Sequence, residues 1–220
     1  MADKAFYSFV PWYRAGLAAA VGGVAQSTQR ATLQVGLRAQ GGTNGQLADL
    51  VLPQSPPVSL IGPGDVIGLD PRAVVRVDPK PFSNDFEPNY LAAVEFFDED
   101  LIYRYSPYPH QGDRLTPWIS LLVLAEDEFQ FAPSAPDLPR AIVLTKDGLV
   151  PPVDEIALWG HVHLNATEAN PADPGALAAK LRSDPALGCS RLLSPRRLEP
   201  GKVYHAFVVP TFEAGRVAGL

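Results

Sequence analysis

Cysteine is almost absent from this chain. Its 220 residues include a single one, Cys189, so an internal disulfide is excluded and a reducing compartment such as the cytoplasm is favoured. The segment GCSRLL around Cys189 contains no evident base. We therefore expect this thiol to be buried and inert rather than a nucleophile.

Long apolar runs are missing as well. Residues 15–25 are apolar, but the stretch contains Gly22 and Gly23 and is much shorter than the roughly 20 residues that cross a bilayer. It follows aromatic and charged residues instead of a basic start, which does not fit a signal peptide. The sequence predicts no membrane span.

Positive charge is also scarce. Lys and Arg number 18 against 24 Asp and Glu, which gives a net charge of −6. Such a balance disfavours nonspecific attraction to nucleic acid or to anionic membranes. The one basic concentration is Arg191, Arg196, Arg197 and Lys202, and it lacks interleaved aromatic residues, so a solvated surface patch fits it better than a nucleic-acid groove.

Motifs of common enzymes do not occur. There is no G-x-S-x-G nucleophile elbow, and neither GPGD nor PGALAA is followed by the Lys-Ser/Thr of a phosphate-binding loop. We expect a chain that is not an enzyme and that needs no cofactor.

The sequence does contain enough apolar residues for a packed core, and a segment in which glycine and proline restrict the backbone. Hydrophobic residues make up 46% of the chain, and ten Phe, seven Tyr and three Trp favour a packed interior. Residues 60–81 alternate β-branched stretches with glycine and proline, which restrict the backbone path. We predict a type II turn at residues 62–65, with Gly64 at positive φ and the Asp65 side chain bonded to nearby backbone amides.

The apolar pattern predicts many short strands. Period-two alternation of Leu33, Val35 and Leu37 predicts a strand over residues 31–40, joined to residues 47–52 by the turn GGTNGQ. The continuous apolar run 118–126 predicts a strand buried on both faces, and residues 202–210 predict another strand. Residues 155–164 fit either a strand or a helix.

Few helices are expected, and the overall class follows. Pro11 and the Gly22–Gly23 pair could bound one helix, and Pro174, with Leu177 and Leu181 four residues apart, indicates another. The sequence predicts an α+β, mostly β fold with many short strands and two or three short helices. We expect a single structural domain over residues 1–220, with a weak sub-boundary near residues 132–140.

One pattern suggests metal chemistry. His161 and His163 would project from one face of a strand, and Glu168 and Gly175 complete an H-x-H-x4-E-x6-G spacing that resembles the first metal motif of cupin barrels. His205 could supply the histidine that cupins take from a later strand. The glycine expected before the first histidine and the second cupin motif are absent. Two structural histidines are the alternative, and we favour it.

A second candidate is the stretch 84–105, rich in carboxylates and aromatic rings. Asp98, Glu99 and Asp100 are consecutive, so their side chains diverge, and a solvated turn fits them better than paired acid–base catalysis. The aromatic side chains could be core, or they could form a docking face for a partner protein. The predicted partner-interface residues are Phe86, Tyr90, Tyr103 and Tyr105.

Five blocks of the sequence carry a family resemblance: GPGDVIGLDPRAVVR, DFEPNYLAAVEF, LTPWISLLVL, SRLLSPRRLEP and YHAFVVPTFEAGRVAGL. In this order they resemble a bacterial protein family found among gene sets of phage-tail-like contractile injection systems. The resemblance implies a structural component of such a particle, in its cap, baseplate or an accessory layer. It implies other particle subunits and further copies of the chain as partners, and assembly in the cytoplasm with release of the particle to the medium. A cupin-like metal-dependent enzyme is the second hypothesis for the function of the chain, and a small-molecule binding module is the third.

Overall fold

The structure is a computed structural model of the whole chain. It describes the strands at residues 7–9, 32–34, 38–41, 48–51 and 57–59, and then residues 61–106, 116–133, 140–165 and 173–218. Within this part of the chain, no helix has the length and apolar character that crossing a bilayer requires.

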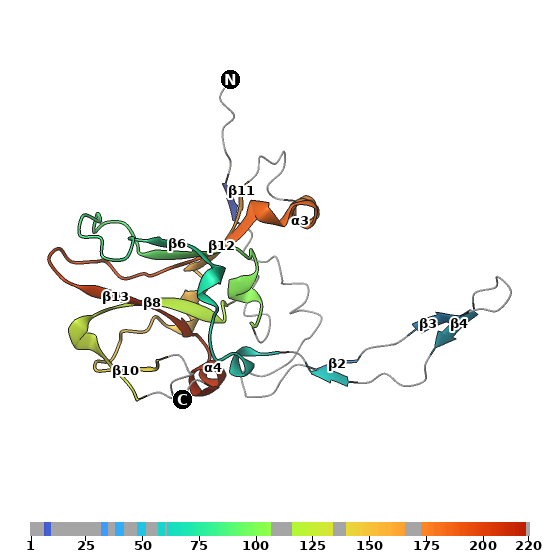
Figure 1. Cartoon of the computed structure of the whole chain (residues 1–220), viewed down its shortest axis with the longest axis horizontal. Helices are drawn as coiled ribbons and strands as arrows, with labels where there is room; N and C mark the ends of the chain where they lie inside the picture. The colour runs from blue at the N-terminus through green and yellow to red at the C-terminus, as the bar shows by residue number, and fades with distance from the viewer. Residues whose placement is uncertain are drawn as a thin grey trace, which may run out of the picture.

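A five-stranded sheet forms the upper layer in Figure 1. All of its strand pairs are antiparallel, and a bulge at Val75 interrupts the edge pair between Val74 and Arg76. Alternate residues face the interior, where Phe96, Val162 and Leu164 are almost completely buried. The strands in spatial order are β1 (Tyr7–Phe9), β11 (Gly160–Asn165), β12 (Gly188–Leu193), β7 (Ala93–Phe96) and β6 (Val74–Asp78).

A narrower layer packs beneath this sheet. β8 (Ile119–Ala125) pairs antiparallel with β13 (Tyr204–Pro210), and β9 (Phe129–Phe131) pairs with β10 (Ile142–Leu144). Every residue of β8 is buried, which confirms the prediction of a strand covered on both faces. One face of β8 belongs to the main core and the other to a smaller core around Phe129.

Short helical turns close the main core. The 3-10 turn η3 (Leu101–Tyr103) is buried, and the indole Nε1 of Trp118 donates to the Leu101 carbonyl at 2.6 Å. The predicted helix is α3 (Pro174–Ser183), which begins where the Asp173 carboxylate accepts the amides of Gly175 and Ala176. The other turns and helices are η1 (Pro63–Asp65), η2 (Pro71–Ala73), η4 (Glu126–Glu128), α2 (Val153–Ile156), η5 (Pro185–Leu187) and α4 (Glu213–Ala218).

The turn at residues 62–65 differs from the prediction. It is a 3-10 turn, and Gly64 is not among the described glycines at positive φ. Asp65 behaves as predicted, because its Oδ2 accepts the Gly62 amide at 2.9 Å. The constraint at Gly64 is instead close packing: a Cβ there would lie 3.3 Å from both Cβ and O of Ala214 in α4, so α4 would have to shift slightly to admit it. The sequence singled out Gly64 for its backbone angles, whereas the structure shows a packing constraint.

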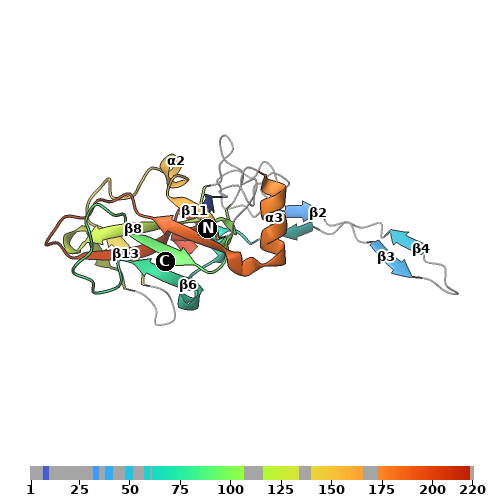
Figure 2. The ribbon, with the colours of Figure 1, turned by 90° about the horizontal axis from the view of Figure 1, so that it is seen from above.

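An arm of paired strands extends from this body (Figures 1 and 2). β2 (Thr32–Gln34) pairs with β5 (Pro57–Ser59), and β3 (Arg38–Gly41) pairs with β4 (Ala48–Val51) between them in the chain. Both pairs are antiparallel, and each forms a separate two-stranded sheet. The predicted pairing of residues 31–40 with residues 47–52 is therefore confirmed for residues 38–41 only, because residues 32–34 pair with β5.

The elements together confirm an α+β, mostly β fold. Residues 155–164, which the sequence left ambiguous, divide into the end of α2 and the strand β11. The suggested sub-boundary near residues 132–140 falls between β9 and β10, which pair with each other, and residues 134–139 lie outside the described part. The helix expected between Pro11 and Gly22 also lies outside it.

Candidate interaction surface

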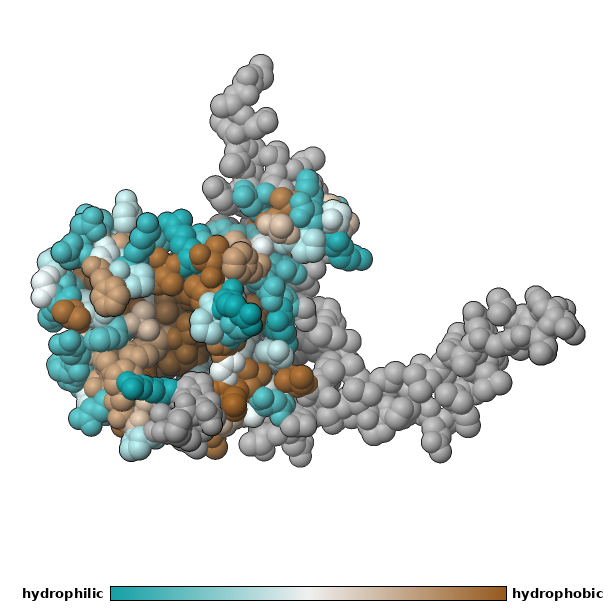
Figure 3. All heavy atoms as spheres, viewed as in Figure 1, coloured by the Kyte–Doolittle hydropathy of each residue, from teal (hydrophilic) through white to brown (hydrophobic). Residues whose placement is uncertain are grey.

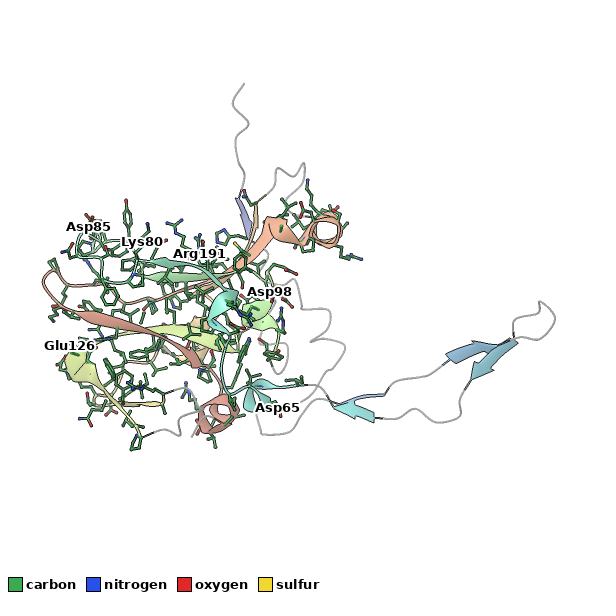
Figure 4. All side chains as sticks on the ribbon, viewed as in Figure 1. Asp65, Lys80, Asp85, Asp98, Glu126 and Arg191 are labelled. Atoms are coloured by element: carbon green, nitrogen blue, oxygen red, sulfur yellow. The ribbon has the colours of Figure 1, made fainter. Side chains whose placement is uncertain are left out.

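Two of the predicted interface aromatics lie in a surface loop between β6 and β7. Tyr90 is 66% exposed, and its ring meets Phe86 edge to face at 6.4 Å between centroids. Side chains of the loop fix its shape: Ser83 Oγ donates to Asp85 at 2.8 Å, and Asn89 Nδ2 donates to Glu87 at 2.6 Å. Figure 4 shows Lys80 and Asp85 at this outer end of the molecule. The loop therefore presents aromatic surface from a constrained backbone.

The other two predicted aromatics belong to the core, which corrects the expectation of a single docking face. Tyr103 is 3% exposed, and its hydroxyl donates to the Gly160 carbonyl at 2.8 Å. Burial raises the pKa of this hydroxyl well above its usual value. Tyr105 is half-buried and meets Trp118 edge to face at 4.9 Å. Tyr103 is therefore a core residue that a partner cannot reach, and Tyr105 packs one side of its ring against the core.

Acidic residues of the stretch 84–105 also contribute to the folded structure more than the sequence predicted. Asp100 is 3% exposed, and Arg104 Nη2 binds its carboxylate at 2.7 Å and that of Asp98 at 2.6 Å. The prediction of a solvated turn is therefore wrong for Asp100. Its carboxylate joins a network that holds the η3 turn in place.

A second loop meets the aromatic loop and forms an open depression. Arg197 Nη2 donates to the Asn89 side-chain oxygen at 2.9 Å, which ties residues 196–202 to the loop before β7. The depression has a volume of about 580 Å³ and a mainly apolar lining. Its lining residues are Pro88, Asn89, Arg197, Leu198, Glu199 and Pro200. Beside it, Tyr90 adds an exposed ring, so this end of the body offers a mixed apolar and polar surface.

A partly buried ion pair anchors the second loop, and no local sequence pattern indicated it. Nη1 and Nη2 of Arg196 donate to the Glu128 carboxylate, at 2.6 and 3.0 Å. Glu128 is 7% exposed and also accepts the Ala125 amide at 2.8 Å. The hydrogen bonds from Arg196 lower the pKa of this carboxyl. The partners are 68 residues apart in sequence, a separation at which no local pattern reveals the pair.

The predicted histidine pair lies on the outer face of the five-stranded sheet. His161 and His163 project from β11, opposite Arg191 and Cys189 of β12. Arg191 in turn binds Glu95 of β7, with Nε 2.7 Å from Oε1. Figure 4 shows Arg191 on this side of the sheet, away from β8 and β13. The prediction that both histidines share one face of a strand is confirmed.

These outer-face groups are held in their neutral forms. His163 is 6% exposed, and its burial, with Arg191 nearby, lowers its pKa to about 4. Burial likewise raises the pKa of the Cys189 thiol. Cys189 is only half-buried, not fully buried as expected, but a thiol with a raised pKa is a poor nucleophile at neutral pH, in agreement with the expected inert role.

The described residues do not bring the proposed cupin-like metal ligands together. His205 lies on β13, in the other layer, where its ring packs 5.2 Å from that of Phe129 and its Nε2 lies 3.8 Å from Glu126. Glu168 lies outside the described residues. Among the residues that are described, no three His, Cys, Asp or Glu side chains are grouped so that they could hold a metal ion.

Comparison with known proteins adds no relative. No protein-family model, curated protein or solved structure matches this chain. Its function is therefore argued from its own residues and geometry.

Proposed function

We propose that this chain is a non-enzymatic structural subunit of a phage-tail-like contractile injection particle, placed in its cap, its baseplate or an accessory layer. Support comes first from where the five sequence blocks lie. They supply β6, β7, β8, β12, β13 and α4, which are neighbouring elements of the two layers. Blocks far apart in the sequence thus build one scaffold, as expected where a family preserves a shape.

The observation that carries the proposal is the combination of this scaffold with a projecting arm. An isolated two-stranded ribbon is marginally stable in water, so the arm gains stability when another surface receives it. The body also presents the loop aromatics Phe86 and Tyr90 at a different end. A rigid body with separate contact regions suits a subunit that links neighbours in a larger particle.

Gene deletion with complementation tests this function. Cells that encode the particle would be deprived of this chain and then complemented with wild type or with the double variant Phe86→Ala and Tyr90→Ala. We expect electron micrographs of the deletion strain to show missing or incomplete particles, wild type to restore them, and the variant to restore fewer. The double variant Tyr90→Phe with Phe86→Tyr is the matched control because it keeps both rings. Normal particles in the deletion strain would refute a structural role.

A further inference from the structure

The loop between β6 and β7, residues 79–92, presents one phenylalanine ring entirely to solvent. Phe82 is fully exposed, so its side chain buries no surface against the rest of its own chain. A phenylalanine ring gains free energy when it leaves water, and aromatic rings are common anchors of protein interfaces. A single exposed apolar residue is ordinary on a protein surface, so the case for a contact depends on the backbone that holds the ring.

That backbone holds Phe82 in a strained conformation. The Ser83 amide donates to the Lys80 carbonyl at 3.0 Å, and Phe82 has a φ of 64°. With Pro81 before it, Phe82 stands at the position of a type II turn that normally holds glycine, because a side chain is unfavourable at positive φ. No other non-glycine residue in the described part of the chain has a positive φ. Since no contact within the chain offsets this strain, we look for the contact outside it.

An open depression beside this loop can receive an aromatic ring. Pro88 and Asn89 line it from the same loop, and Leu198 and Pro200 line it from the second loop. Its volume of about 580 Å³ and its mainly apolar lining suit a phenylalanine side chain. The ring of the same copy does not fill it, because Phe82 is fully exposed. A ring from another molecule is therefore required.

Unpaired charges of opposite sign flank the ring and the depression. Asp85 and Glu87 follow Phe82 in the loop and accept hydrogen bonds from neutral side chains, and neither carboxylate forms an ion pair within the described part of the chain. At the depression, the Arg197 guanidinium binds the neutral Asn89 side chain and no carboxylate in that part. A ring from a second copy would bring its loop carboxylates toward Arg197, which favours this orientation of the two molecules.

The ring, the depression and the complementary charges all lie at one end of the body. Figure 1 shows the loops before β7 and before β13 at the same end, and Figure 4 places Lys80 and Asp85 there. Figure 3 shows hydrophobic side chains among hydrophilic ones at this end. We infer that two copies of the chain pair through this surface, with Phe82 of each copy seated in the depression of the other.

Such a contact is isologous, because the same surface of both copies forms it about a two-fold axis. It closes at two copies and does not grow into a filament. It deepens the proposed function, on which it rests for its biological setting, by naming a second copy as the partner at this end. The purified chain tests the pairing without the particle, so a failure of the pairing and a failure of the proposed function are observed in different experiments.

Sedimentation of the full-length purified protein tests the role of the ring. We expect wild type to dimerise as concentration rises and to form nothing larger, and Phe82→Asn to weaken the dimer by roughly tenfold or more. Asparagine tolerates positive φ, so this variant should melt at or above the temperature of wild type although it associates less. Phe97→Asn is the matched control, because Phe97 is also exposed but lies after β7, and it should dimerise like wild type.

Two outcomes of that experiment would overturn the inference. One is a wild type that stays monomeric at its highest soluble concentration, which would leave Phe82 to a different partner. The other is unchanged association of Phe82→Asn, which would place the contact between copies on another surface.

Charge reversal tests the orientation of the two copies. Asp85→Lys and Arg197→Glu should each dimerise more weakly than wild type, because each brings like charges together in both halves of the contact. An equimolar mixture of the two should form a one-to-one dimer, because every reversed carboxylate or guanidinium then meets an opposite charge. Circular dichroism and thermal melts would establish that both variants fold. A mixture no more associated than its components would contradict the arrangement.

Hydrogen exchange of wild type keeps the inference testable if a charge variant does not fold. The amides of residues 82–90 and 196–202 should become more protected as concentration rises, whereas those of β8 should not change. Protection at these two loops that does not depend on concentration would overturn the contact.

Discussion

The buried histidine of β11 predicts a specific loss of stability in mild acid. His163 is 6% exposed, and its pKa in the folded protein is lowered to about 4. In the unfolded chain its pKa returns to about 6.5, so below that pH the unfolded state binds a proton that the folded state does not. Stability is complete above pH 6.5, falls as the pH drops toward 4, and then levels off. The linkage gives a loss of about 2 kcal/mol between pH 7.5 and pH 5.

Chemical denaturation of wild type and His163→Gln at several pH values between 7.5 and 5 measures this loss. We expect the variant to be less stable than wild type at pH 7.5 but to lose about 2 kcal/mol less on acidification, because it has no proton to bind at that position. His205→Gln is the control, since His205 lies in the other layer and its side chain is 42% exposed. Equal pH dependence of wild type and His163→Gln would refute the reasoning.

Three further predictions concern packing and charge. Glu128→Gln should lower the free energy of unfolding by roughly 1–3 kcal/mol at pH 7. The difference from wild type should shrink below about pH 4.5, because the lowered pKa of Glu128 stabilises the fold only while the carboxyl is ionised. Denaturant titrations at pH 7 and pH 3.5 check this prediction, and a difference that does not change with pH would contradict it. Gly215→Ala should lower the melting temperature because its Cβ would lie 2.7 Å from Cβ of Pro210, and a melt equal to wild type would show that α4 can move aside. Tyr103→Ala should lower the free energy of unfolding by about 3–5 kcal/mol because it leaves a cavity in the core, whereas Tyr90→Ala should leave that free energy nearly unchanged. Equal free energies of unfolding for these two variants would contradict the assignment of Tyr103 to the core and Tyr90 to the surface.

Much of the fold could be predicted from local pattern. The strand β8, the alternating β13, the capped helix α3 and the strands of the arm each have a periodicity or a terminal residue that identifies them. These signals lie within about ten residues of sequence. Prediction succeeded where the cause of a structure is local.

The candidate site was harder to predict because its causes are distant. Whether Tyr103 is core or surface depends on Gly160, 57 residues away, and the role of Arg196 depends on Glu128. Gly64 was singled out for its backbone angles, but the constraint that the structure shows there is its close approach to Ala214. A single sequence shows which residue types occur in a segment, but not which distant segment covers them.

Quantitative mass spectrometry of purified particles tests the central claim most directly. Particles would be isolated from cells that encode this chain, washed at high salt to remove loosely bound protein, and analysed for the number of copies of each subunit. The account predicts that this chain remains bound at a fixed ratio to the other subunits. Its absence from washed particles, or a ratio that varies from one preparation to the next, would contradict a structural role.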